Sequence, residues 1–288
     1  YIVIPHYANT ANHKAVLSIG GSAEAQTEIN ASRWENTAAI TSVTLLALAG
    51  DFDALSYFAI GVVDERYAIG ETILSGSDGT FSFAALPAEE GNLGMVLYCR
   101  TDKSGANDEI KVHLNSDTTA SNYSRQLVYG NGSSALAAKS SANQFGFSPG
   151  NTAASNVFGA QVGLISQYNR GVNDPLWTGA GGWQDDSASR VGLFTGRRNN
   201  VEAVTAVAVT PHDGTNFKDG SMMSLYYTPK RLLYRNLGTG AASVTMPVAA
   251  SVKAGGGTPS AYIGIDALVY ARSAQSGVTE DELEIQIN

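Results

Sequence analysis

An internal repeat is the feature that most constrains how this chain can fold. The segment Arg33–Val43 matches Arg197–Val207 at a constant offset of 164 residues. Upstream of it, Ile4, Tyr7 and Asn12 match Ile165, Tyr168 and Asn173 at an offset of 161. Self-similarity at a fixed period is typical of a duplicated folding unit. The sequence therefore predicts two copies of one domain, with a small loop insertion that accounts for the change of offset.

A second repeated block occurs in the opposite order along the chain. Residues Tyr98–Gly105 resemble Tyr270–Gly277, and Asp108–Asn115 resemble Asp281–Asn288, including the closing asparagine. In the central copy this block precedes the Arg197 segment. In the other copy it follows the Arg33 segment and lies at the far end of the chain, as expected if that copy is circularly permuted.

We therefore predict one continuous domain over residues 71–229 and one split domain made of residues 1–66 and 232–288. Exposed excursions tolerate chain ends best, and residues 116–160 of the central copy are such an excursion without a counterpart. The split domain can close within one chain or receive its C-terminal strands from a neighbouring subunit. Closure within the chain is favoured, because its effective concentration is higher.

Hydrophobic periodicity indicates strands rather than helices. Alternation with a period of two places one face of a segment in a core. The segments that show it, or are rich in β-branched residues, are 39–46, 80–83, 109–114, 203–209 and 283–287. Only the alanine-rich segment Ser134–Ser141 is compatible with one or two helical turns. The predicted fold class is all-β: two tandem-related antiparallel β-sandwich, jelly-roll-like domains, one of them split between the chain ends.

Charge and composition exclude several classes of protein. The net charge is −8, and no basic cluster is large enough to bind nucleic acid through its phosphates. No apolar run approaches the roughly 20 residues that span a bilayer, so no membrane association is expected. The single cysteine, Cys99, excludes an intrachain disulfide and is interpreted as a small buried residue.

Two segments resemble minor structural proteins of tailed bacteriophages. They are Asn115–Ser124, which follows an alternating strand, and Trp34–Leu45, which is followed by Gly50-Asp51-Phe52. The resemblance implies β-sandwich or jelly-roll modules of tail fibres, baseplates or capsid decorations. It implies location in a virion assembled in the host cytoplasm, other virion proteins as partners, and a homo-oligomeric or lattice-bound state.

No catalytic centre, cofactor site or metal site is predicted. The four histidines lack zinc-site spacing, and His113 is expected to face solvent from the polar side of its strand. The acidic pairs Asp51/Asp53 and Asp185/Asp186 could bind calcium or hydrolyse a glycosidic bond. Turn formation is the stronger interpretation, because aspartate hydrogen-bonds its own backbone in turns.

Four aromatic residues are the candidate ligand or interface residues. Tyr123, Tyr129, Trp177 and Trp183 are expected in the loop-like half of the central domain, where such side chains could stack on sugars or anchor an interface, although core packing is favoured. A fifth aromatic, Phe217, occupies the same repeat position as Phe52. Both are predicted to be buried anchors after a turn.

The sequence thus predicts a non-enzymatic virion structural protein, either a capsid decoration or cement protein or a tail-associated component. The alternative is a receptor-binding module of a tail fibre that recognises a cell-surface glycan. The lack of a stalk or heptad segment favours the first.

Overall fold

The described part of the molecule is built almost entirely of β-strands. The computed structural model describes residues 2–22, 26–43, 68–74, 78–88 and 91–229. Within these ranges the only helical element is a single 3₁₀ turn, η2 (Ala120–Asn122). All strands pair in antiparallel fashion, in sheets of three, four and eight strands. The predicted all-β, antiparallel fold class is confirmed.

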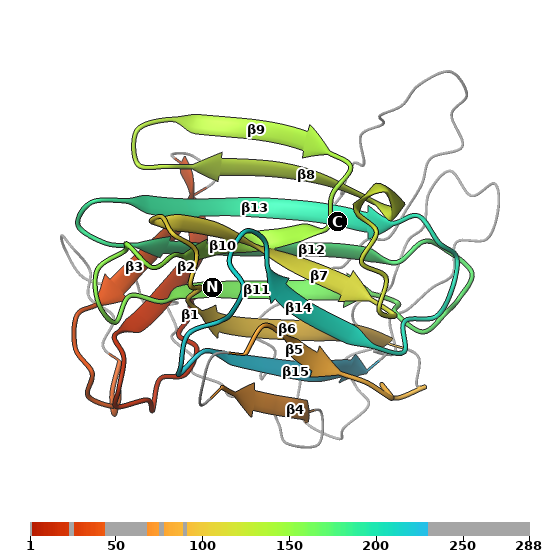
Figure 1. Ribbon diagram of the computed structural model, residues 1–288, viewed down its shortest axis with the longest axis horizontal. Helices are drawn as coiled ribbons and strands as arrows, with labels where there is room; N and C mark the ends of the chain where they lie inside the picture. The colour runs from red at the N-terminus through yellow and green to blue at the C-terminus, as the bar shows by residue number, and fades with distance from the viewer. Residues whose placement is uncertain (1, 23–25, 44–67, 75–77, 89–90, 230–288) are drawn as a thin grey trace. The chain divides into compact units, whose positions relative to one another are not determined.

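The eight-stranded sheet forms the middle layer, and its strands follow one another from top to bottom in Figure 1. In that order they are β9 (Ala135–Ser140), β8 (Tyr123–Gly130), β13 (Ser189–Arg198), β12 (Leu176–Gln184), β11 (Gly159–Ser166), β6 (Gly91–Cys99), β15 (Met222–Pro229) and β4 (Ala68–Ile73). Glycine lets the core pack closely against this sheet. A Cβ on Gly163 would overlap the ring of Phe145.

A four-stranded sheet covers the inner face of the eight-stranded sheet. Its order is β10 (Gln144–Pro149), β7 (Asn107–Leu114), β14 (Val207–Pro211) and β5 (Phe81–Phe83). The alternating side chains Ile110, Val112 and Leu114 of β7 are fully buried in the main core, as their periodicity predicts. Strand β10 packs over β11, β12 and β13, and β9 stays exposed along its length. The two sheets therefore form a sandwich whose inner face is incompletely covered near β8 and β9.

A third, three-stranded sheet covers the outer face of the eight-stranded sheet. It consists of β1 (Ile2–Val3), β2 (Lys14–Ser22) and β3 (Gln26–Trp34). Leu17 of β2 packs in a second core that contains Tyr98 and Phe158, whose rings stack at 4.6 Å. The Tyr98 hydroxyl donates a hydrogen bond to the carbonyl of His13, which fixes the hairpin to the sheet.

The pairing of this small sheet recurs in the eight-stranded sheet at the offsets of the sequence repeat. Adding 161 to each number turns the pair Ile2↔Ser18 into Gly163↔Gly179, which are partners in β11 and β12. In the pair Ala15↔Arg33, adding 161 to the first number and 164 to the second gives Leu176↔Arg197, which are partners in β12 and β13. Register is set by many side chains at once, so agreement over two strand pairs is a demanding match.

The turn after the first repeated strand recurs as well. His6 and Gln167, which are 161 residues apart, have left-handed backbone φ angles of 54° and 50°. The amide of Ile40 donates to the carbonyl of Tyr7 at 2.9 Å, and the amide of Val204 donates to that of Tyr168 at 2.6 Å. Tyr7 is 50% exposed whereas Tyr168 is 1% exposed, so the same backbone geometry occurs in two different surroundings.

The prediction of one split and one continuous domain stays a prediction. Residues 44–66 and 232–288, which would complete the split domain, lie outside the described residues, as does the strand expected at Leu283–Ile287. The strand expected at residues 39–46 is not formed over 39–43, and its remainder is also outside the described residues.

Two local expectations are wrong. The segment Ser134–Ser141 contains the strand β9 rather than a helical turn, because it pairs with β8 from Gly130↔Ala135 to Arg125↔Ser140. This ladder satisfies the backbone of β8 and overrides the helix propensity of alanine. His113 is 7% exposed rather than solvent-facing, since its ring nitrogens contact Thr210 at 3.0 Å and Asn143 and the carbonyl of Asp117 at 3.2 Å.

Candidate functional site

Three of the four predicted candidate aromatics belong to the core. Tyr123, Trp177 and Trp183 are at most 1% exposed and lie on strands β8 and β12 rather than in loops. They are therefore not available to a sugar or to a partner, and core packing, the favoured alternative, describes them. Tyr129 of β8 is half-buried, and its ring contacts that of Phe147 at 5.4 Å.

The predicted acidic pairs divide between the described and undescribed parts of the chain. Asp51 and Asp53 lie outside the described residues. Asp185 is 4% exposed and accepts hydrogen bonds from the amides of Ser187, Ala188 and Ala154. Burial alone would raise its pKa, but these donors hold the pKa below its usual value. Its oxygens are thus occupied in a turn, as the structural interpretation predicts.

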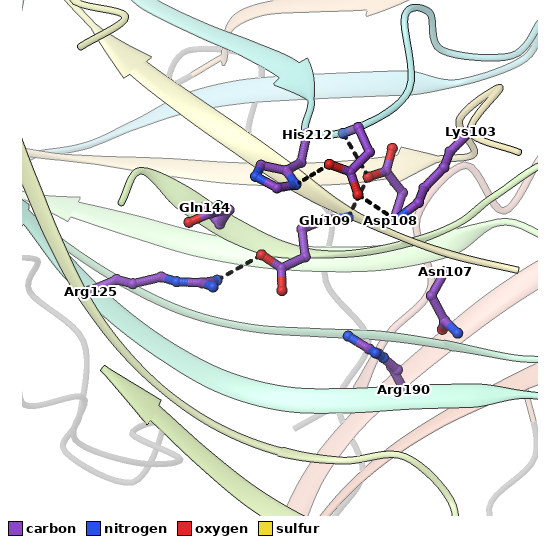
Figure 2. Close-up of a pocket in the computed structure, with 9 residues that line it drawn as sticks. Lys103, Asn107, Asp108, Glu109, Arg125, Gln144, Arg190 and His212 are labelled. Carbon is purple, nitrogen blue, oxygen red and sulfur yellow. Dashed lines mark hydrogen bonds and ion pairs between the residues drawn. The ribbon is translucent and has the colours of Figure 1, made fainter. Parts of the chain in front are cut away.

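A polar pocket with a volume of about 260 Å³ opens beside the uncovered part of the inner face. Figure 2 shows its side chains converging from both layers of the sandwich. They are Asn107, Asp108 and Glu109 of β7, Gln144 of β10, Arg125 of β8, Arg190 of β13, and Lys103, His212 and Asp213 from the connections. All nine are polar or charged, which distinguishes this space from the apolar core next to it.

Ion pairs fix one wall of the pocket. Arg125 contacts Glu109 with 3.0 Å between Nη1 and Oε2, and Lys103 contacts Asp213. His212 Nδ1 lies 2.9 Å from the other oxygen of Asp213. The hydrogen bond from Lys103 keeps the pKa of Asp213 below its usual value, so this carboxyl group is a poor proton donor.

Asp108 has a structural role at the edge of the pocket. One of its oxygens accepts from the amides of Glu109 at 2.8 Å and Asp213 at 3.1 Å, and the other accepts from Gly214 at 3.1 Å. Asp108, His212 and Asp213 present ligand atoms within 4.8 Å of one another. A cation there would have to displace these amides and Lys103, so the geometry does not favour a metal site.

Arg190 is the cation of the pocket that lacks a carboxylate partner among the described residues. Its guanidinium carbon lies 5.3 Å from the ring centre of Tyr129 and 5.5 Å from that of Phe147. A guanidinium held over aromatic faces keeps its outward N–H groups available for a planar anion. Tyr129 is thus the one predicted aromatic that contributes to the pocket, through Arg190.

The pocket lacks the groups of a familiar hydrolytic site. Its lining contains no serine, threonine or cysteine nucleophile. A paired-carboxylate hydrolase needs one carboxyl group with a raised pKa, and the hydrogen bond from Lys103 lowers the pKa of Asp213 instead. The expectation that the whole chain lacks a catalytic centre stays a prediction.

Sequence reasoning missed the pocket residues. Asn107 and Glu109 alternate on the polar side of β7, which is a signal for a surface face and nothing more specific. Their meeting with Arg125 and Arg190 depends on how two sheets stack, and that information is spread over residues far apart in the chain.

Comparison with known proteins adds little. No family model matches the chain, and no curated protein matches it. A search of solved structures returns the tripod of the baseplate of bacteriophage Tuc2009, with 15% sequence identity and a TM-score of 0.23 over 66% of this chain and 80% of that chain. A superposition with that TM-score carries no argument about fold or function. None of the helices in the described residues is long and apolar enough to span a membrane.

Proposed function

We propose that this chain is a non-enzymatic structural protein of a tailed-phage virion, either a capsid decoration or a tail-associated component. It acts through protein–protein contacts with other virion proteins or with further copies of itself. The resemblance of Asn115–Ser124 and Trp34–Leu45 to minor phage structural proteins supports this proposal, and so does the all-β fold.

An exposed apolar strip at the edge of the eight-stranded sheet carries the proposal. Val128 and Leu193 are directly paired across β8 and β13 and are 55% and 48% exposed, and Ala137 of β9 continues the row. Strand β9 has one neighbour, β8, so within the described part of the chain its other edge presents unpaired backbone groups. Exposed apolar rows and free strand edges are typical of surfaces that bind other proteins.

The test is a charge placed in the strip. Val128→Glu should reduce incorporation into particles at least tenfold without changing the melting temperature, because a buried carboxylate at a contact is costly. Val201→Glu is the matched control, since Val201 is equally exposed at 55% but lies beyond β13. Incorporation is measured by immunoblotting of purified particles. Normal incorporation of both variants, or absence of the wild-type protein from particles, would contradict the proposal.

The copy number per particle separates the two structural roles. A decoration protein is present in far more copies than a tail component, so quantitative mass spectrometry of purified virions distinguishes them. A second candidate function, recognition of a cell-surface glycan by a tail protein, is favoured by one observation, the polar pocket beside Arg190.

A further inference from the structure

Asn115, which follows strand β7, binds the loop that leads into β14. Its side-chain oxygen accepts from the amides of Thr205 at 2.7 Å and Ala206 at 3.2 Å, and its side-chain nitrogen donates to the carbonyl of Ala203 at 2.7 Å. Its backbone has a left-handed φ of 53°, a conformation that asparagine adopts more readily than most residues. One carboxamide thus fixes this loop to β7, which lies beside β14 in Figure 1.

The first repeat contains the same loop at residues 39–42. The offset of 164 residues turns Ala203, Thr205 and Ala206 into Ala39, Thr41 and Ser42. Neither loop is part of a strand, and in each of them one amide donates to the carbonyl of the repeated tyrosine, as described above. The backbone that receives Asn115 in the central copy is therefore present in the first copy as well.

Among the described residues, nothing fills the first loop as Asn115 fills its counterpart. The amides of Thr41 and Ser42 make no hydrogen bond within the described part of the chain, and both residues are exposed. Val43 is 37% exposed whereas Val207 is fully buried, because Val207 pairs with Leu114 of β7. The described part of the first repeat thus presents the surface that binds β7, without a strand on it.

The sequence contains a second copy of the segment that fits this surface. Asp281–Asn288 repeats Asp108–Asn115, with apolar residues at the same alternate positions and asparagine at the end. A strand that adds to a sheet edge gains affinity from its backbone and specificity from its alternate side chains. The asparagine also sets the register, since a slip by one residue would remove its side chain from the loop and turn the apolar face outward.

We propose that the carboxamide of Asn288 binds the loop 39–42 of its own chain. Its oxygen accepts from the amides of Thr41 and Ser42, and its nitrogen donates to the carbonyl of Ala39. Binding within the chain is favoured over binding by a second copy because its effective concentration is higher. This contact closes the predicted split domain, and it does not rest on the proposed virion role.

The test measures amide hydrogen exchange in the full chain by NMR. In the wild type, the amides of Thr41 and Ser42 should exchange at least tenfold more slowly than the same amides in an unstructured peptide. Asn288→Ala should abolish this protection, because both donors lose their acceptor. The amides of Thr205 and Ala206 are the internal reference and should stay protected.

Three variants distinguish this contact from a general loss of structure. Asn288→Asp keeps an acceptor, so the two amides of the first loop should exchange more slowly than in Asn288→Ala. Gln286→Ala changes a polar position of the same segment and should leave both rates unchanged. Asn115→Ala is the mirror variant, and it should release the amides of Thr205 and Ala206 alone.

A mixing experiment identifies which chain supplies the asparagine. Isotope-labelled Asn288→Ala is unfolded in urea with an excess of unlabelled wild type, and the two are refolded together. The labelled chains should stay unprotected at Thr41 and Ser42. Restored protection would show that a second copy supplies Asn288 and would overturn binding within one chain. The proposal also fails if these amides are unprotected in the wild type, if Asn288→Ala leaves their exchange unchanged, or if Gln286→Ala accelerates it equally.

Discussion

Replacement of Phe217 by alanine is the most direct test of how the central sandwich is held together. Phe217 is fully buried, and its ring lies 4.8 Å from that of Phe81 of β5. Its amide donates to the carbonyl of Asp78 at 2.8 Å, and isolated bridges connect it to both Asp78 and Thr101. The backbone of Phe217 therefore bridges the segments at Asp78 and Thr101, and its ring packs in the core after a turn, as the sequence predicts for this repeat position.

The magnitude follows from the area that the ring removes from water. An aromatic side chain buries about 150–250 Å², which at about 25 cal/mol per Å² corresponds to roughly 4–6 kcal/mol. Phe→Ala substitutions in packed cores cost about 3–5 kcal/mol, because the surroundings relax partly into the cavity. We expect a loss of about 4 kcal/mol for Phe217→Ala, and a smaller loss for Phe217→Leu, which keeps most of the apolar volume.

The assay is urea denaturation followed by the fluorescence of the buried tryptophans Trp177 and Trp183. The midpoint should fall in the order wild type, Phe217→Leu, Phe217→Ala, with an unchanged slope. Val201→Ala, at an exposed position, should leave the free energy of unfolding within about 0.5 kcal/mol of wild type. A loss below about 1 kcal/mol for Phe217→Ala would refute the reasoning, because a fully packed ring cannot be removed at so small a cost.

Three further predictions concern charge, the thiol and the chain ends. Burial alone would raise the pKa of Asp117, but hydrogen bonds from Asn122, Thr119 and Arg198 lower it. The stabilising effect of this carboxylate is therefore present above about pH 4 and is lost as pH falls through its folded pKa. In Asp117→Asn, the free energy of unfolding should depend less steeply on pH in that acid range. Burial raises the pKa of Cys99 to about 12, so a thiol reagent at pH 8 should label the unfolded chain and spare the folded one. If the C-terminal strand takes the place of β7 in the split domain, the double variant Val43→Cys, Ile287→Cys should form a disulfide under mild oxidation. The disulfide lies within one chain for self-closure and between chains for strand donation. The absence of both cross-links would contradict the predicted pairing.

Strand periodicity predicted the all-β fold class because it depends on local pattern. Ile110, Val112 and Leu114 are buried as their alternation requires, and Phe217 is buried as its repeat position suggests. His113 was misjudged because β7 lies between two other strands, so residues on its polar side also meet neighbours.

The pocket was beyond sequence reasoning for a different reason. Arg190 and Arg125 lie on the inner face of the eight-stranded sheet, and Glu109 belongs to the sheet that covers it. Neither charge pattern is unusual within its own strand. These side chains meet because the four-stranded sheet covers only part of the eight-stranded sheet. The number of strands in each sheet is not encoded in any single segment.

The division of the pocket between two sheets has a mechanical consequence. Arg190 and Arg125 move with one layer of the sandwich, whereas Glu109 and Gln144 move with the other. Sliding one layer over the other therefore changes the spacing of the groups that would hold a ligand. By reciprocity, a ligand that bridges both layers resists that sliding. A ligand bound across the two layers would raise the resistance of the domain to shear, and shear of the domain would weaken the binding of that ligand.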